Sequence, residues 1–145
     1  MRKKGWIVWT WSRAGALMVS MVLMIVFLSS VGFVTTSLSS VSANMITRDF
    51  RNLILDVDGA FSGMTMEYSF PAFLEGREYL VEVMRSGEYI GIVAHYTHNP
   101  SIKGAASFSG KLTNSSYGVM NKAGEESHIC IVSLEGGVTL QRSKC

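Results

Sequence analysis

The sequence predicts an α+β protein in which an N-terminal transmembrane helix continues into, or is linked to, an amphipathic helix that precedes a small antiparallel β-sheet domain. Three patterns support this: an uncharged apolar run near the start, apolar residues three and four positions apart after it, and period-two alternation further on. The chain has 145 residues, of which 48% are hydrophobic and 17% charged. That length allows one globular domain, and the low charged fraction indicates that apolar residues are concentrated in one segment.

The apolar run covers residues 14–34, which are 21 residues without a charge, proline, asparagine or glutamine. As a helix it would be about 31 Å long, close to the hydrocarbon thickness of a bilayer. Its polar side chains are Ser20, Ser29 and Ser30, and a serine in a helix can donate its hydroxyl to a carbonyl one turn earlier. The alternative is a helix buried in a protein core, but the rest of the chain is too small to cover it on every side.

The charges on either side of the run predict its orientation. The residues before position 44 carry four cations and no acid, a net charge of +4, whereas residues 44–145 carry nine cations and eleven acids. The four cations are Arg2, Lys3, Lys4 and Arg13. By the positive-inside rule, residues 1–13 stay in the cytoplasm and residues 35–145 lie outside.

Aromatic residues cluster in the basic flank. Trp6, Trp9 and Trp11 stand just before the apolar run, where indole rings favour the headgroup zone. Together with Arg13 they are expected to anchor the helix at the membrane interface. Stacking on nucleic acid is the other interpretation of tryptophans among cations, but the exported part is slightly acidic, so no nucleic-acid partner is expected.

The apolar run is either retained as an anchor or removed as a signal peptide. Val41-Ser42-Ala43 has the small-x-small form of a cleavage site, so a cut before Asn44 is one alternative. The run is longer than an ordinary signal core and thirteen residues precede it, which favours retention. Both alternatives place the remainder of the chain outside the cytoplasm.

Residues 35–58 are expected to hold a linker and an amphipathic helix. The stretch 35–43 is rich in serine and threonine and is either a short linker or a continuation of the membrane helix. After it, Asn44 is a candidate N-cap and Gly59 a candidate C-terminal stop. Apolar residues recur at helical spacing and form one stripe between them: Met45, Ile46, Phe50, Leu53, Ile54 and Val57.

Residues 59–145 are expected to form a β-rich domain. Alternating patterns predict about six short strands, and Pro71 ends the first of them. Asn99-Pro100 is expected to end another strand, and the polar stretch 113–126 is predicted to be a loop. Glu135-Gly136-Gly137 is expected to be the turn of a closing hairpin. The predicted strands are 64–70, 79–84, 89–97, 105–112, 129–134 and 138–141.

The order of these parts resembles that of archaeal pilin-like, membrane-anchored exported proteins. The resemblance rests on the start Lys3-Lys4-Gly5-Trp6, the apolar span, the amphipathic helix and the small β domain, with a strand, proline turn and strand at 68–83. It implies cleavage after a basic-Gly site, here Lys4-Gly5, and assembly through the exposed apolar helix. The chain has no Glu between Gly5 and Asp49, where bacterial-type pilins carry one, which favours a non-polymerising relative.

Two cysteines, Cys130 and Cys145, can form a disulfide in an oxidising exterior. A two-residue turn at Gly136-Gly137 would set Cys130 opposite Ser143, which leaves Cys145 at a marginal distance for a bridge. Two free thiols are therefore the alternative. Asn114, in the sequence Asn114-Ser115-Ser116, is a candidate N-glycosylation site in an exported loop.

The histidines His95, His98 and His128 carry no recognisable metal or catalytic motif. His95 and His98 are three apart, which places them on opposite faces of a strand. His128 and Cys130 share a face, so an exported metal-binding or enzymatic domain would require these four residues to converge. No catalytic, metal-ligating or cofactor-binding residue is assigned from the sequence, and neither enzymatic activity nor a cofactor is expected.

The sequence therefore predicts a single-pass membrane protein, N-terminus inside, with a structural or interaction role at the cell surface. Its expected partners are the lipid bilayer and, through the apolar helix, other copies of the chain or other envelope proteins. One alternative is a pilin-like subunit of a type IV-type filament or secretion apparatus. Another is the exported metal-binding or enzymatic domain.

Overall fold

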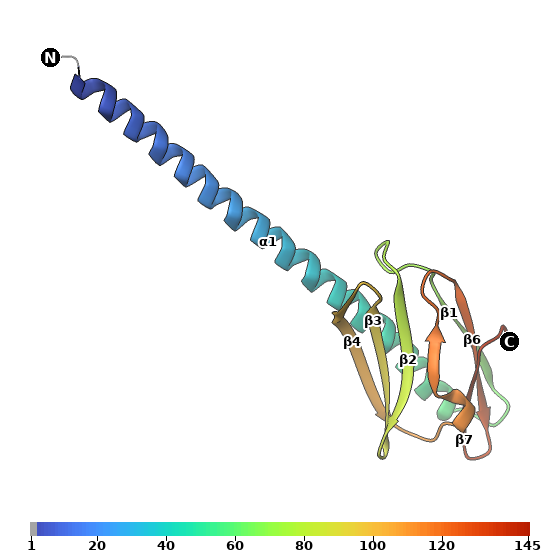
Figure 1. Ribbon diagram of the computed structural model, residues 1–145. Coiled ribbons are helices and arrows are strands. Elements are labelled where there is room, and N and C mark those ends of the chain that lie inside the picture. The colour runs from blue at the N-terminus through green and yellow to red at the C-terminus, as the bar shows by residue number, and fades with distance from the viewer. Residues whose placement is uncertain (1–2) are drawn as a thin grey trace. The chain divides into compact units, whose positions relative to one another are not determined.

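The structure is a computed structural model that describes the backbone of residues 3–145 and the side chains of residues 13–145. Within these residues one long helix precedes two antiparallel sheets, so the predicted α+β class is confirmed (Figure 1). The chain divides into two compact units, and the second comprises Leu38–Cys145. The elements are α1 Lys3–Asp58, β1 Thr65–Phe70, β2 Tyr79–Ser86, β3 Tyr89–Tyr96, β4 Asn99–Ser109, the 3₁₀ helix η1 Asn114–Ser116, β5 Gly118–Asn121, β6 Ser127–Leu134 and β7 Gly137–Gln141.

Helix α1 is continuous through the serine-rich stretch 35–43, so this stretch is a continuation of the helix and not a linker. The hydroxyls of Thr35 and Thr36 donate to the carbonyl of Gly32, which ties these polar side chains to the helix backbone. The prediction of a helix start at Asn44 is wrong, because Asn44 lies inside α1 and its Oδ1 accepts a hydrogen bond of 3.1 Å from the backbone N–H of Ala105. The predicted end is confirmed, since α1 stops at Asp58.

One face of the C-terminal part of α1 is buried against the sheets. Its residues follow the three-and-four spacing of an amphipathic helix. The prediction that Met45 belongs to this stripe is wrong, because Met45 is 59% exposed. Successive helical residues are rotated by about 100°, so Met45 points away from the side to which Ile46 points. The buried residues of α1 are Ser39, Ala43, Ile46, Thr47, Phe50, Ile54 and Val57.

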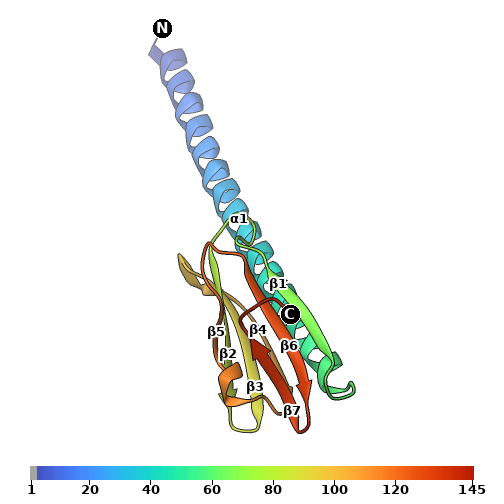
Figure 2. The ribbon, with the colours of Figure 1, turned by 90° about the vertical axis from the view of Figure 1, so that its right-hand side faces the viewer.

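The strands form two antiparallel sheets around this helical face. The three-stranded sheet has the order β1-β6-β7, and the four-stranded sheet has the order β4-β3-β2-β5. Figure 2 shows β1 beside the C-terminal part of α1. There the ring of Phe50 lies 5.2 Å from that of Tyr68 and 5.0 Å from that of Phe70. Buried residues of α1 and of both sheets belong to a single core.

Two strand predictions differ from the structure. Asn99-Pro100 does not end a strand; the chain turns at Thr97-His98, and β4 begins at Asn99. Proline is tolerated there because β4 is at the edge of its sheet, where a missing N–H leaves no ladder bond unmade. The stretch 113–126, predicted to be a loop, contains η1 and β5. The sequence did not predict β5 because this strand has only four residues and no clear alternation.

Strand β4 crosses α1 at Gly104. A Cβ atom built on Gly104 would overlap the backbone of Ala43 and of Asn44, so only glycine lets the strand approach the helix this closely. Gly104 pairs with the buried Ala94 of β3, so it lies on the side of the sheet that faces the core. The contact therefore fixes the distance between the four-stranded sheet and α1.

We predict that Gly104→Ala lowers the free energy of unfolding of residues 38–145 by at least about 2 kcal/mol, because backbone on both sides must move. Chemical denaturation of the protein in detergent measures this change. The matched control is Gly91→Ala in β3, where the new methyl group would meet the flexible side chain of Met84 at 3.4 Å. Equal losses in the two variants would contradict the close crossing.

Candidate functional site

The apolar part of α1 is exposed along its length. From Leu17 to Val34 its large hydrophobic side chains are between 45% and 74% exposed. The mean hydropathy reaches 2.5 in a window of which none is buried within the chain. The structure therefore excludes burial of this segment in the core of its own chain. α1 is long and apolar enough to cross a membrane, near the N-terminus.

The serine interactions predicted for this segment are confirmed. Ser20 donates to the carbonyl of Ala16 at 2.9 Å, and Ser29 donates to that of Ile25 at 2.8 Å. Ser30 makes the same bond to Val26. Every side-chain hydroxyl within residues 14–34 thus has a partner in the helix itself, as a lipid environment requires.

The flanking anchors are described only in part. The side chains of Trp6, Trp9 and Trp11 lie outside the described residues, so the expected interface position of these indoles stays a prediction. Arg13, the last cation before the apolar run, is exposed.

A polar cluster lies near the start of residues 38–145. Ser39 Oγ donates a hydrogen bond of 2.8 Å to Glu75, and Ser42 Oγ donates to the other carboxylate oxygen. The carbonyl of Ser39 also accepts a bond of 3.2 Å from the hydroxyl of Tyr96. We call the part of the domain around these contacts the near end; it includes the loop 71–78 and the turn Thr97-His98.

Glu75 is held in a tight turn. Its φ is 54° and that of Gly76 is 72°, and Leu74 and Arg77 exchange two backbone hydrogen bonds of 2.9 and 3.0 Å across the turn. Hydrogen bonds from Ser42 and then Ser39 lower the pKa of the exposed Glu75 carboxyl below its ordinary value; burial acts weakly in the opposite direction, and Arg77 adds a small lowering. A carboxylate here is therefore favoured over the neutral acid.

Two tyrosine hydroxyls donate hydrogen bonds at the near end, one to the loop and one to α1. The hydroxyl of Tyr79 donates a bond of 2.9 Å to the carbonyl of Pro71, while Tyr96 donates to Ser39 as described above. Burial is the main cause that raises the pKa of both phenols. Both hydroxyls stay protonated at neutral pH, so they act as permanent hydrogen-bond donors.

Glu75, Ser39 and Ser42 were missed in the sequence. The dipeptide Glu75-Gly76 is a recognisable turn signal, but its partners lie 33 and 36 residues earlier in a stretch that resembles a linker. Nothing in the local pattern joins them.

His128 lies among polar side chains on the outer face of the three-stranded sheet. Its Nδ1 is 2.9 Å from Glu67 Oε1 and also 2.9 Å from Ser69 Oγ, and its Nε2 is 4.0 Å from Glu126. A serine–histidine–carboxylate relay requires the serine and the acid at different ring nitrogens. Here Ser69 and Glu67 both meet Nδ1, and Glu126 at 4.0 Å from Nε2 is beyond hydrogen-bond distance, so these contacts tie β1 to β6 and do not form such a relay.

A cavity of about 450 Å³ opens beside His128. Its walls come from β5, the loop before β6, the start of β6 and the residues after β7. Three cations and two acids face it together, so its charges are mixed and leave a formal excess of one cation. The charged residues that line it with His128 are Lys122, Glu125, Glu126, Arg142 and Lys144.

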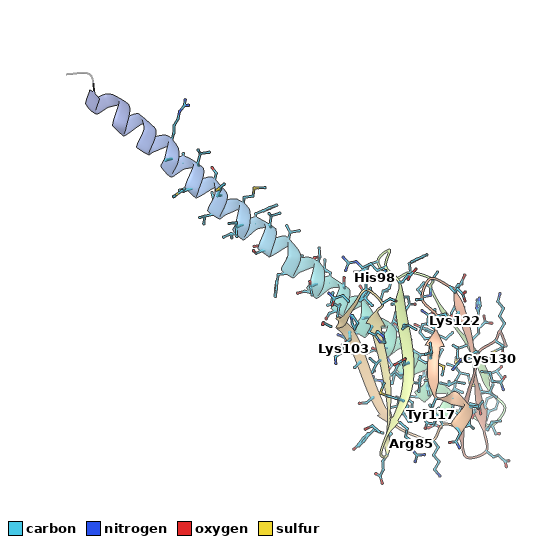
Figure 3. All side chains as sticks on the ribbon, in the orientation of Figure 1. Arg85, His98, Lys103, Tyr117, Lys122 and Cys130 are labelled. Atoms are coloured by element: carbon cyan, nitrogen blue, oxygen red, sulfur yellow. A yellow bond between two sulfur atoms is a disulfide. The ribbon has the colours of Figure 1, made fainter. Side chains whose placement is uncertain are left out.

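Cys130 and Cys145 form a disulfide, with their Cα atoms 5.0 Å apart (Cys130 is labelled in Figure 3). The predicted register was wrong by two residues: the turn is Glu135-Gly136, and Cys130 faces Gln141 instead of Ser143. After β7 the chain bends, with Ser143 N–H bonded to the carbonyl of Gln141, and this bend brings Cys145 back to β6. The disulfide thus closes the last residues over the outer face of the sheet.

The remaining histidines are not brought together with these groups into a metal site. His95 lies in β3 and His98 in the turn before β4. Among residues 13–145, no group of three or more His, Cys, Asp or Glu side chains is placed to hold a metal ion. Cys130 is committed to its disulfide, which removes the thiolate ligand considered in the sequence.

Asn114 is exposed at the start of η1, as a glycosylation acceptor must be, but its sequon serine is not free. Ser116 is fully buried, and its Oγ accepts a bond of 2.9 Å from the N–H of Leu140. Modification of Asn114 stays a prediction.

Comparison with protein-family models, with curated proteins and with solved structures finds no match for this chain.

We predict that Cys145→Ser lowers the free energy of unfolding by about 3 kcal/mol, because the bridge closes a loop of 15 residues in the unfolded chain. Denaturation in detergent, with and without a dithiol reductant, measures the loss. Reduction should leave the variant unchanged while it destabilises the wild type by the same amount. A variant as stable as the oxidised wild type would contradict the prediction.

We predict that Glu75→Gln flattens the acid limb of the stability profile. Because the folded-state pKa of Glu75 lies below its ordinary value of 4.5, its contribution is present above that value and is lost as pH falls through the lower one. The wild type should therefore lose more stability than the variant below about pH 4.5. Thermal unfolding across this range measures it. Ser42→Ala, which removes the main donor, should reproduce part of the flattening, and parallel curves for all three proteins would contradict it.

Proposed function

We propose that this chain is a single-pass membrane protein that keeps its basic N-terminal flank in the cytoplasm and holds residues 38–145 outside as a structural or interaction domain. The observation that carries the proposal is the exposure of the whole apolar run from Leu17 to Val34. That surface is compatible with lipid and not with water. The cation-rich flank before the run supports the orientation.

The packing of residues 38–145 supports retention of the helix. Ser39 and Ala43 are 2% and 1% exposed, and they stand before the candidate cleavage point at Asn44. Cleavage there would remove the donors to Glu75 and the backbone against which Gly104 packs. Because the domain packs residues from both sides of this cleavage point, retention of the helix is favoured.

A pilin-like subunit of a filament or secretion apparatus is the second candidate. It is favoured by an apolar stripe on α1 beyond the 14–34 run, formed by Leu38, Val41 and Met45, which are each more than half exposed. These residues are three and four apart and so share a helical face. Such a stripe suits contact with the helix of another copy.

We predict that the full chain stays in the membrane pellet after alkaline extraction, and that a C-terminal tag is cleaved by protease added to intact cells. Acidic substitution of the basic flank (Arg2, Lys3, Lys4 and Arg13 to Glu) should protect the tag by reversing the orientation. The charge-matched control exchanges arginine and lysine at the same four positions, Arg to Lys and Lys to Arg. Release of the intact chain by alkali would contradict the proposal.

N-terminal sequencing of the mature protein separates the two candidates. A start at Met1 supports the simple anchor, a start at Trp6 or near Ala16 supports the subunit, and a start at Asn44 contradicts both by showing a secreted domain.

A further inference from the structure

An exposed phenylalanine stands on the loop at the near end of the domain. Phe73 is 52% exposed, although the next residue, Leu74, packs against the core. The loop is held on both sides of Phe73, by the Tyr79 bond to Pro71 and by the two serine bonds to Glu75. The aromatic ring is thus presented to the surroundings by a braced loop.

The braced loop is bonded to a helix residue that lies close to the apolar run along the chain. Ser39, which binds Glu75, follows Val34 by five residues. Five residues rise about 7.5 Å in a helix and reach no more than about 18 Å when fully extended. The headgroup layer beyond the hydrocarbon core is about 5–8 Å thick. The loop is therefore tethered within reach of the membrane surface.

We infer that Phe73 inserts into the headgroup layer of the leaflet on the side of the domain, so that the near end rests on the lipid surface. The inference rests on the proposed membrane anchoring of α1. Phenylalanine is among the residues that bury at the boundary of headgroups and acyl chains in interfacial segments, and the tether keeps the ring beside that layer.

The interaction is apolar and not electrostatic in origin. Charged side chains of both signs occupy the near end, with Glu75 and Arg77 in the loop itself, and His98 lies at the same end of the four-stranded sheet (Figure 3). A zwitterionic phosphocholine surface should therefore suffice, and salt should have little influence.

Phe61 provides a matched comparison. It is 78% exposed and follows the C-terminal end of α1, sixteen helical residues and about 24 Å of rise beyond Ser42. It is thus an exposed aromatic residue at the end of the domain away from the tether.

The test uses the full chain in phosphocholine vesicles, with Trp6, Trp9 and Trp11 changed to Phe to remove their emission. Phe73→Trp or Phe61→Trp is then introduced, and quenching by lipids brominated near the headgroup is measured, with flotation of the vesicles as the test of anchoring. We expect the indole from Phe73→Trp to be quenched and its emission to shift to shorter wavelength. The indole from Phe61→Trp should show neither effect.

Equal quenching of both variants, or quenching of neither in vesicles that carry the protein, would overturn the inference and leave the anchoring intact. Absence of the protein from the floated vesicles would overturn the anchoring as well. If Phe73 instead binds a protein partner, its indole variant stays unquenched by lipid, which is the outcome in which neither variant is quenched.

Discussion

The structure depends on one helix that must satisfy two different surroundings. Between Leu17 and Val34 the side chains of α1 are apolar except for three serines, and the large apolar ones are exposed on all sides. From Ser39 onward one face is buried. An α-helix suits both parts because its backbone hydrogen bonds are internal, so the side chains alone decide what surrounds it. In and just after the apolar run, hydroxyls that could compete with the backbone are instead bonded to carbonyls one turn earlier, as those of Ser29 and Thr36 are.

Both sheets depend on the buried face of that helix. Phe50 meets two aromatic rings of β1, and the backbone around Ala43 meets Gly104 of β4. These contacts lie on different sheets, so the helix supplies the surface against which the inner faces of both are packed. The helix also covers part of an edge strand, because Asn44 Oδ1 accepts a hydrogen bond from the backbone N–H of Ala105 in β4. That N–H is therefore not left unpaired at the edge of the sheet. A polar residue inside the helix thus serves the sheet and not the helix terminus.

Periodicity in the sequence predicted the apolar run, the helical stripe and most strands, because these patterns record burial directly. It failed where the signal was local but its cause was distant. Asn44 has the chemistry of an N-cap, yet the helix had already begun and the side chain found a strand. The hairpin register missed by two residues because Glu135-Gly136-Gly137 allows two turns, and only the paired strands select one. The carboxylate of Glu75 could not be joined to Ser39 and Ser42 by any pattern in the chain.

The stretch 35–43 shows why composition alone misplaces a domain boundary. Its serines suggested a linker between an anchor and a domain, but Ser39 is buried and Ser42 is bonded to the loop 71–78. The packed domain therefore begins at Leu38, four residues after the apolar run ends. In the proposed membrane-anchored arrangement, the three residues between Val34 and Leu38 limit how far the near end can lie from the lipid. Hydroxyls are suited to such a place, because they can bond to the helix backbone or to a carboxylate without adding charge beside the apolar run.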